Sequence, residues 1–137
     1  MSDSRRIMIV DDDDEFVESN RDLLEAYGYE VHSASNGTDG LALARRIRPD
    51  VMILDVMMAT DTEGFEVARR IPESPELKHT KVLLVTGFSK ALNMPVGLKP
   101  DGTWLPVERV LEKPIAPGRL IAEVERVLRK KDGSVLT

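Results

Sequence analysis

The sequence predicts an α/β protein in which a doubly wound parallel sheet is covered by helices on both faces. Short apolar runs, typical of strands buried on both faces, alternate along the chain with segments of helical periodicity. The 137 residues suffice for one compact domain, and 42% hydrophobic with 31% charged residues is the balance of a globular protein. Two of the apolar runs end directly in aspartate, which is typical of a site at the carboxyl edge of such a sheet.

Five strands are expected, each a short and mainly apolar run bounded by polar or turn residues. Residues 7–10 and 51–54 are apolar throughout, as expected of strands in the middle of a parallel sheet. Asn36 and Gly37 are expected to form a turn after the second strand. In chain order, the expected strands are 7–10, 30–34, 51–54, 81–86 and 107–112.

Four segments have the apolar periodicity of amphipathic helices. Gly28 ends the first of them, Pro49 ends the second, and Pro117 begins the last. The third, between the third and fourth strands, is expected to be short. The apolar positions that define the four helices are Phe16, Val17, Leu23, Leu24 and Tyr27; Leu41, Ala44 and Ile47; Phe65, Ala68 and Ile71; and Leu120, Ile121, Val124, Val127 and Leu128.

Residues 91–104 interrupt the alternation of strands and helices. Proline and glycine recur too often there for a long regular element. We therefore expect an irregular segment in place of a regular fourth helix, with at most a short helix over residues 89–94. Trp104 lies in this segment, where it is expected either to cover a sheet edge or to anchor a partner.

The expected strand order is 2-1-3-4-5, which is that of a flavodoxin-like sheet of five parallel strands. The sequence contains no internal repeat and no linker to a second domain. We therefore expect residues 1–137 to form a single domain, with a core of about residues 6–130 and a frayed tail over residues 131–137.

Composition argues against several classes of function. Because cysteine is absent, disulfides, thiolate metal sites and cysteine nucleophiles are excluded. The 19 basic and 24 acidic side chains give a net charge of −5, which argues against direct binding of nucleic acid. No apolar stretch is long enough for membrane insertion and no secretion signal opens the chain, so we expect a cytoplasmic protein. His32 and His79 are expected at the surface.

The residues with the chemistry of a site stand where the expected strands end. Asp11 and Asp12 follow the first strand, Asp55 follows the third, Thr86 ends the fourth and Lys113 follows the fifth. Because the carboxyl ends of neighbouring parallel strands meet at one edge, we expect three carboxylates, a hydroxyl and an ammonium in one cavity. Mg²⁺ fits this set, because it prefers hard oxygen ligands and offsets the repulsion between carboxylates.

Asp55 is the most specific of these residues. It lies between apolar residues on both sides, so its carboxylate is expected to be half-buried, which is costly without a cation or hydrogen bonds. The run of aspartates at 11–14 is less specific, because one of them is expected to cap the following helix. One cap does not need four aspartates, and a divalent ion would remove their mutual repulsion.

On these residues, the sequence resembles the receiver domain of bacterial two-component response regulators. The resemblance extends over about residues 7–128 and is that of a stand-alone receiver domain. Its motifs are Ile-Met-Ile-Val-Asp11-Asp12, Pro49-Asp50-Val-Met-Ile-Leu-Asp55-Val-Met-Met, Val-Leu-Leu-Val-Thr86-Gly87 and Leu-Glu-Lys113-Pro114.

The resemblance implies that Asp55 is the phosphoacceptor, which takes a phosphoryl group from a phosphohistidine on a sensor histidine kinase. It also implies a Mg²⁺ site. The ion would be held by Asp12, Asp55 and the backbone carbonyl of Met57, with Asp11 acting directly or through a water. The resemblance thus describes a phosphoprotein that assists its own phosphorylation and dephosphorylation and is not otherwise an enzyme.

On the same basis, Thr86 would hydrogen-bond the phosphoryl group and Lys113 would pair with it. Phosphorylation would draw Thr86 inward and so switch contacts with other proteins. The chain departs from the family pattern at three places. Val110 stands where an aromatic residue usually follows the threonine, Ala59 stands where proline is usual, and residues 91–104 lengthen the chain before the lysine.

The implied partners are a sensor histidine kinase or a histidine phosphotransfer protein and an unidentified downstream protein, and a dimer is left open. Two other functions compete with this one. The pattern Asp11-x-Asp13 after a strand resembles the nucleophile motif of haloacid-dehalogenase-type phosphatases, although that function leaves Asp55 unexplained. The chain could also be a receiver-like interaction module that is never phosphorylated.

Overall fold

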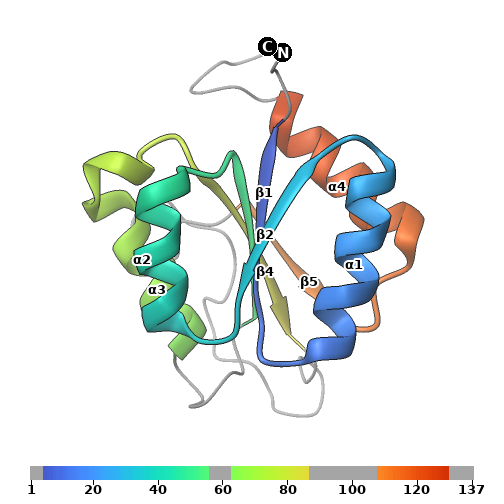
Figure 1. The fold of residues 1–137 in the computed structure, drawn as a ribbon, viewed down its shortest axis with the longest axis horizontal. Helices are drawn as coiled ribbons and strands as arrows, with labels where there is room; N and C mark the ends of the chain where they lie inside the picture. Colours follow the sequence, from blue (N-terminus) through green and yellow to red (C-terminus); the bar gives the residue numbers. More distant parts are fainter. Residues whose placement is uncertain (1–4, 56–62, 87–107, 130–137) are drawn as a thin grey trace.

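The computed structural model describes residues 5–55, 63–86 and 108–129, which form alternating strands and helices (Figure 1). The strands are β1 (Arg6–Val10), β2 (Glu30–Ala34), β3 (Val51–Asp55), β4 (Lys81–Thr86) and β5 (Arg109–Glu112). The helices are α1 (Asp14–Ala26), α2 (Gly37–Ile47), α3 (Glu63–Arg70) and α4 (Pro117–Arg129). Two short 3-10 turns, η1 (Ile71–Glu73) and η2 (Pro75–Leu77), follow α3.

The sheet is parallel throughout, with the strand order β2-β1-β3-β4-β5. Helices α1 and α4 cover one face of the sheet, and α2 and α3 cover the other (Figure 1). These findings confirm the predicted flavodoxin-like, doubly wound fold class. In the part of the chain that the structure describes, no helix has both the length and the apolar content needed to span a membrane.

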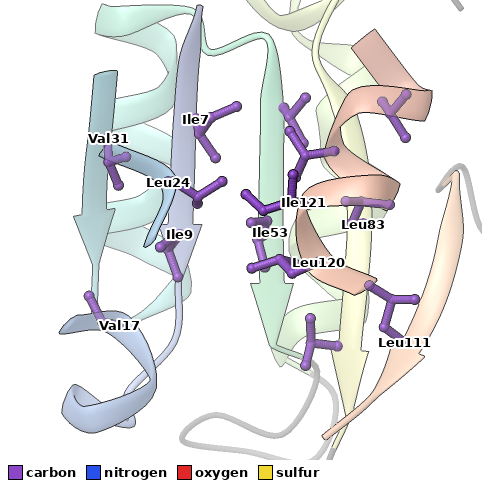
Figure 2. Packing of buried hydrophobic residues seen from close by; sticks show 14 residues of the cluster. Ile7, Ile9, Val17, Leu24, Val31, Ile53, Leu83, Leu111, Leu120 and Ile121 are labelled. Carbon is purple, nitrogen blue, oxygen red and sulfur yellow. The ribbon is translucent and has the colours of Figure 1, made fainter. Parts of the chain in front are cut away.

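Two apolar layers, one on each face of the sheet, form the core. In β1, Ile7 and Ile9 belong to the layer under α1 and α4, whereas Met8 and Val10 belong to the layer under α2 and α3. Figure 2 shows the first of these layers, in which Leu120 of α4 packs towards the strands. Because the last four side chains of β1, Ile7 to Val10, are 0% exposed, the strand is apolar at each of these positions, whereas Arg6 at its start is exposed. Burial of each such side chain contributes about 1.5–3 kcal/mol.

Two local predictions are wrong. Asn36 and Gly37 do not form a separate turn but begin α2, where the Asn36 side-chain oxygen accepts a hydrogen bond from the Asp39 backbone N–H at 2.8 Å. The same residue types favour turns and helix caps, so the local sequence does not distinguish the two. The third helix ends at Arg70 rather than including Ile71, which belongs to the 3-10 turn η1, because Pro72 has no backbone N–H to continue the α-helical hydrogen bonds.

The last strand was predicted over residues 107–112. In the structure, β5 begins at Arg109, and residue 107 lies outside the described residues. Glu108 already joins the sheet, because its backbone N–H donates to the Val82 carbonyl at 2.7 Å. Several predictions concern positions outside the described residues. They are the short helix over 89–94, the irregular segment over 91–104 with Trp104, and the tail over 131–137.

The two histidines differ in their surroundings. His79 is exposed, as predicted. His32 is half-buried in the edge strand β2, and its Nε2 lies 2.6 Å from Glu30 Oε2. The hydrogen bond with His32 is the main cause that lowers the pKa of the Glu30 carboxyl below its usual value.

Candidate functional site

Consecutive strands of the sheet bring four of the predicted site residues to one edge. Asp11 follows β1, Asp55 ends β3, Thr86 ends β4 and Lys113 follows β5. The carboxyl ends of these strands lie at the lower edge of the sheet in Figure 1. The backbone N–H of Lys113 donates to the Thr86 carbonyl at 2.8 Å, so the pairing of β4 with β5 continues up to the lysine.

Asp11, Asp12 and Asp55 form a cluster in which one carboxylate oxygen from each residue lies within 4.8 Å of the other two. Asp11 and Asp55 are buried, with exposed fractions of 1% and 5%, whereas Asp12 is exposed. Carboxylates at this separation repel one another when ionised, and burial adds a desolvation cost unless a cation is near. A divalent cation that prefers oxygen ligands fits this donor set.

The described residues satisfy only part of the hydrogen-bonding capacity of the buried Asp11 carboxylate. Its Oδ1 accepts a hydrogen bond from the Asp13 backbone N–H at 2.9 Å. Its Oδ2 forms an ion pair with Lys113 Nζ at 2.9 Å, but accepts no hydrogen bond of good geometry from the residues that the structure describes. A buried carboxylate oxygen with unused acceptor capacity is a suitable metal ligand, so the donor set fits Mg²⁺ on this ground as well.

Among the residues that the structure describes, three groups contact the Lys113 ammonium. Besides Asp11, it lies 3.8 Å from Asp13 Oδ2 and 4.2 Å from the centroid of the Phe16 ring. The lysine side chain is 19% exposed, and its peptide bond to Pro114 is cis. The sequence predicted the lysine at this edge but not its contact with Phe16. Helical periodicity placed Phe16 on the apolar face of a helix. It carries no information about a contact with Lys113, which follows the last strand of the sheet.

Asp13 confirms the expectation that one aspartate of the run at 11–14 caps the next helix. It is the N-cap of α1, and its Oδ1 accepts hydrogen bonds from the backbone N–H groups of Glu15 and Phe16 at 3.1 and 3.2 Å. The remaining carboxylates of the run are free of this structural task, and two of them, Asp11 and Asp12, belong to the cluster with Asp55.

A groove lies beside the lysine, between α1 and the segment that joins β5 to α4. Its volume is about 920 Å³. Its wall combines apolar side chains with carboxylates, and Lys113 itself forms part of it. The lining residues are Asp13, Glu15, Phe16, Ser19, Asn20, Asp22, Leu23, Lys113, Pro114, Ile115 and Pro117. The sequence does not predict this groove, because its two sides come from elements that only the fold brings together.

Other predictions about the site concern residues on or near its edge. Met57, whose backbone carbonyl was predicted as a metal ligand, lies outside the described residues, as does Ala59. Val110, at the position where an aromatic residue is usual, lies in β5 opposite Leu84 and packs partly buried against the apolar layer under α2 and α3.

The chain is similar to known proteins in both sequence and fold. The family of response regulator receiver domains matches residues 7–125. Among solved structures, the chemotaxis response regulator CheY4 of Vibrio cholerae superposes with a TM-score of 0.77 at 30% identity, covering 91% of this chain and 99% of that one.

Two curated relatives are similar in sequence. The polar-differentiation response regulator DivK of Brucella anthropi is 38% identical over 85 residues, which are 62% of this chain and 68% of DivK. The response regulator PleD of Caulobacter vibrioides is 36% identical over 132 residues, which are 93% of this chain but 27% of PleD. This chain therefore spans about a quarter of PleD, whose remaining length has no counterpart in the alignment.

Proposed function

Because the chain belongs to the family of response regulator receiver domains of two-component signalling, we propose that it accepts a phosphoryl group on Asp55 and thereby switches its contacts with other proteins. Receiver domains are signalling modules rather than classical enzymes. The proposal treats residues 1–137 as one such module, which assists its own phosphorylation and dephosphorylation.

One observation carries this proposal. The buried Asp55 carboxylate shares a cluster with Asp11 and Asp12 at the sheet edge where Lys113 and Thr86 also lie. A phosphoryl group that bonds to Asp55 would meet an ammonium and a hydroxyl brought there by neighbouring strands. Charge stabilisation of this kind is the main contribution that proteins make to phosphoryl transfer.

The proposed reaction is an in-line transfer. An oxygen of Asp55 attacks the phosphorus of a phosphohistidine while the P–N bond breaks, and the electron pair of that bond returns to the imidazole nitrogen, which then takes up a proton. Lys113 offsets the negative charge on the phosphoryl oxygens, and the Thr86 hydroxyl donates a hydrogen bond to one of them. Asp12, Asp55 and the Met57 carbonyl would hold Mg²⁺, with Asp11 acting directly or through a water, and the ion would supply further positive charge at the site.

The proposed phosphodonor is a sensor histidine kinase or a histidine phosphotransfer protein. The groove between α1 and the β5–α4 segment supports a protein donor, because Lys113 lies in its wall and a partner seated there would adjoin the reacting groups. Apolar side chains such as Leu23 and Ile115, together with the carboxylates of Glu15 and Asp22, suit a partner surface that is apolar with basic residues. The downstream protein is a separate partner that responds to the phosphorylated form.

The test is phosphorylation by acetyl phosphate with Mg²⁺, followed by mass spectrometry of the peptides. We expect a single labile phosphoryl group on Asp55, and no label in Asp55→Asn. Asp14→Asn, a neighbouring exposed acid outside the cluster, is the matched control and should label like the unchanged protein. Label on Asp11 instead would support the phosphatase, and a protein that takes up neither Mg²⁺ nor phosphate would support an unphosphorylated module.

A further inference from the structure

We propose that Phe16 is a positioning residue, which holds the Lys113 ammonium at the site through the face of its ring. This inference rests on the proposed function, in which Lys113 pairs with the phosphoryl group. Its basis is the distance of 4.2 Å between Lys113 Nζ and the centroid of the Phe16 ring. An ammonium within about 6 Å of an aromatic centroid is attracted by the negative face of the ring.

A lysine at this place needs positioning. Its four-carbon side chain has many rotamers, and an ammonium that samples many positions is poorly placed to pair with a phosphoryl group. The two carboxylates that hold it have other tasks in the proposed mechanism. Asp11 is a candidate metal ligand, and Asp13 caps α1 through its other oxygen. Phe16 carries no charge, so it can attract the ammonium without binding the metal and without repelling a phosphoryl group.

The ring is itself fixed in two ways. The Phe16 backbone N–H donates to Asp13 Oδ1 at 3.2 Å, so the cap of α1 orients the first turn that carries the ring. The side chain is half-buried and packs against the apolar layer under α1 and α4. The contact thus joins α1 to the residue that follows β5. It holds the lysine side chain from the helix, whereas the strand holds only the lysine backbone.

Packing alone does not require an aromatic residue here. Leucine would also fill a half-buried position on the apolar face of α1, but it has no ring face to offer an ammonium. The two roles can therefore be separated by exchanging Phe16 for leucine, which keeps an apolar side chain, and for tryptophan, which keeps and strengthens the ring face.

The first measurement is the initial rate of phosphorylation of the full chain by acetyl phosphate with Mg²⁺. Phe16→Leu should lower this rate by about two- to fivefold, the range expected for loss of one cation–π contact. Phe16→Trp, which keeps a ring face, should have about the rate of the unchanged protein. The matched control is Tyr29→Leu, the same kind of exchange at a residue that packs against the same layer but lies before β2, at the opposite end of the sheet. It should leave the rate unchanged.

The second measurement needs neither metal nor phosphorylation. In the Mg²⁺-free protein, the ring current should shift the Lys113 ε-methylene proton resonances upfield. That shift should disappear in Phe16→Leu and persist in Phe16→Trp and Tyr29→Leu. Absence of the shift from the unchanged protein would overturn the contact, and an undiminished rate in Phe16→Leu would overturn the positioning role.

Two further outcomes also count against the proposal. If Phe16→Trp is phosphorylated as slowly as Phe16→Leu, or if Tyr29→Leu slows phosphorylation as much as Phe16→Leu does, packing rather than the ring face matters. A protein that shows the upfield shift but takes no label on Asp55 would contradict the proposed function and with it the role of Lys113, while the contact itself would stand. The failures of the two proposals are thus distinguishable.

Discussion

At the scale of single residues, Asp13 has two contacts of different kinds. One carboxylate oxygen caps α1 by accepting hydrogen bonds from two backbone N–H groups, and the other lies 3.8 Å from the Lys113 ammonium. The first contact depends on oxygen acceptors and the second depends on negative charge. Asparagine keeps a side-chain acceptor for the cap but carries no charge, so the two contributions can be separated by substitution.

We expect Asp13→Ala to lower the free energy of unfolding by about 0.5–2 kcal/mol, because it leaves two N–H groups of α1 without their partner. Asp13→Asn should cost little by comparison, since asparagine caps helices about as well as aspartate. Glu18→Ala, an exposed position further along α1, is the control and should change stability by less than about 0.5 kcal/mol. Urea unfolding followed by circular dichroism measures all three variants. Equal losses in the alanine and asparagine variants would mean that charge, not capping, dominates.

At the scale of elements, α4 and β5 are joined by a buried carboxylate. Glu123 of α4, whose side chain is 9% exposed, lies 3.3 Å from Arg109 of β5. Two arginines of its own helix also contact it, Arg119 at 3.3 Å and Arg126 at 3.1 Å. Burial raises the pKa of Glu123, but the hydrogen bond from Arg126, the charge of Arg109 and the hydrogen bond from Arg119 together outweigh it and lower the pKa below the usual 4.5.

This pKa shift predicts a pH dependence of stability. The folded protein favours the carboxylate form of Glu123, so this group contributes to the free energy of unfolding at pH values above its usual pKa of 4.5. That contribution is lost as the pH falls through the lowered pKa that Glu123 has in the folded protein. Glu123→Gln should therefore lose less stability on acidification below that pH than the unchanged protein. Urea midpoints measured at successive pH values give the slope of stability against pH for each protein. Glu25→Gln, at an exposed position in α1, is the control. Identical slopes in Glu123→Gln and the unchanged protein would contradict the prediction.

At the scale of the whole molecule, the acidic cluster brings together the ends of two neighbouring strands, β1 and β3. Asp11 and Asp12 come from the end of one strand and Asp55 from the end of its neighbour, and their mutual repulsion opposes the pairing that brings them together. A cation bound only by the folded protein would offset this repulsion and stabilise the fold through mass action.

We therefore expect Mg²⁺ to raise the free energy of unfolding, by about 2.7 kcal/mol at a concentration of about 100 times its dissociation constant. A chelator should reverse the effect. Asp12→Asn should strongly reduce this dependence on Mg²⁺, whereas Glu76→Gln, an exposed acid in η2 outside the cluster, should keep it. The measurement is urea unfolding with and without the ion. An equal response to Mg²⁺ in Asp12→Asn would mean that the ion binds elsewhere.

Much of this molecule could be predicted because its local patterns agree with one another. The apolar β1 and β3 indicated strands covered on both faces, and the run of aspartates after β1 indicated both a cap and a cluster. The errors were local ones. Asn36 caps a helix rather than forming a turn, because side chains that favour helix caps also favour turns. Ile71 lies beyond α3, because the ends of helices are only weakly determined by nearby residues.

The amino-acid sequence alone determined the alternation of elements, the buried character of the central strands and the chemistry available at the strand ends, because these follow from periodicity and from residue type. Only the tertiary structure decided that the Lys113 ammonium lies between Asp11, Asp13 and the Phe16 ring, and that a groove opens beside it. Such contacts join the first turn of α1 to the end of β5. Their distances depend on how helix and sheet pack, which no local pattern encodes.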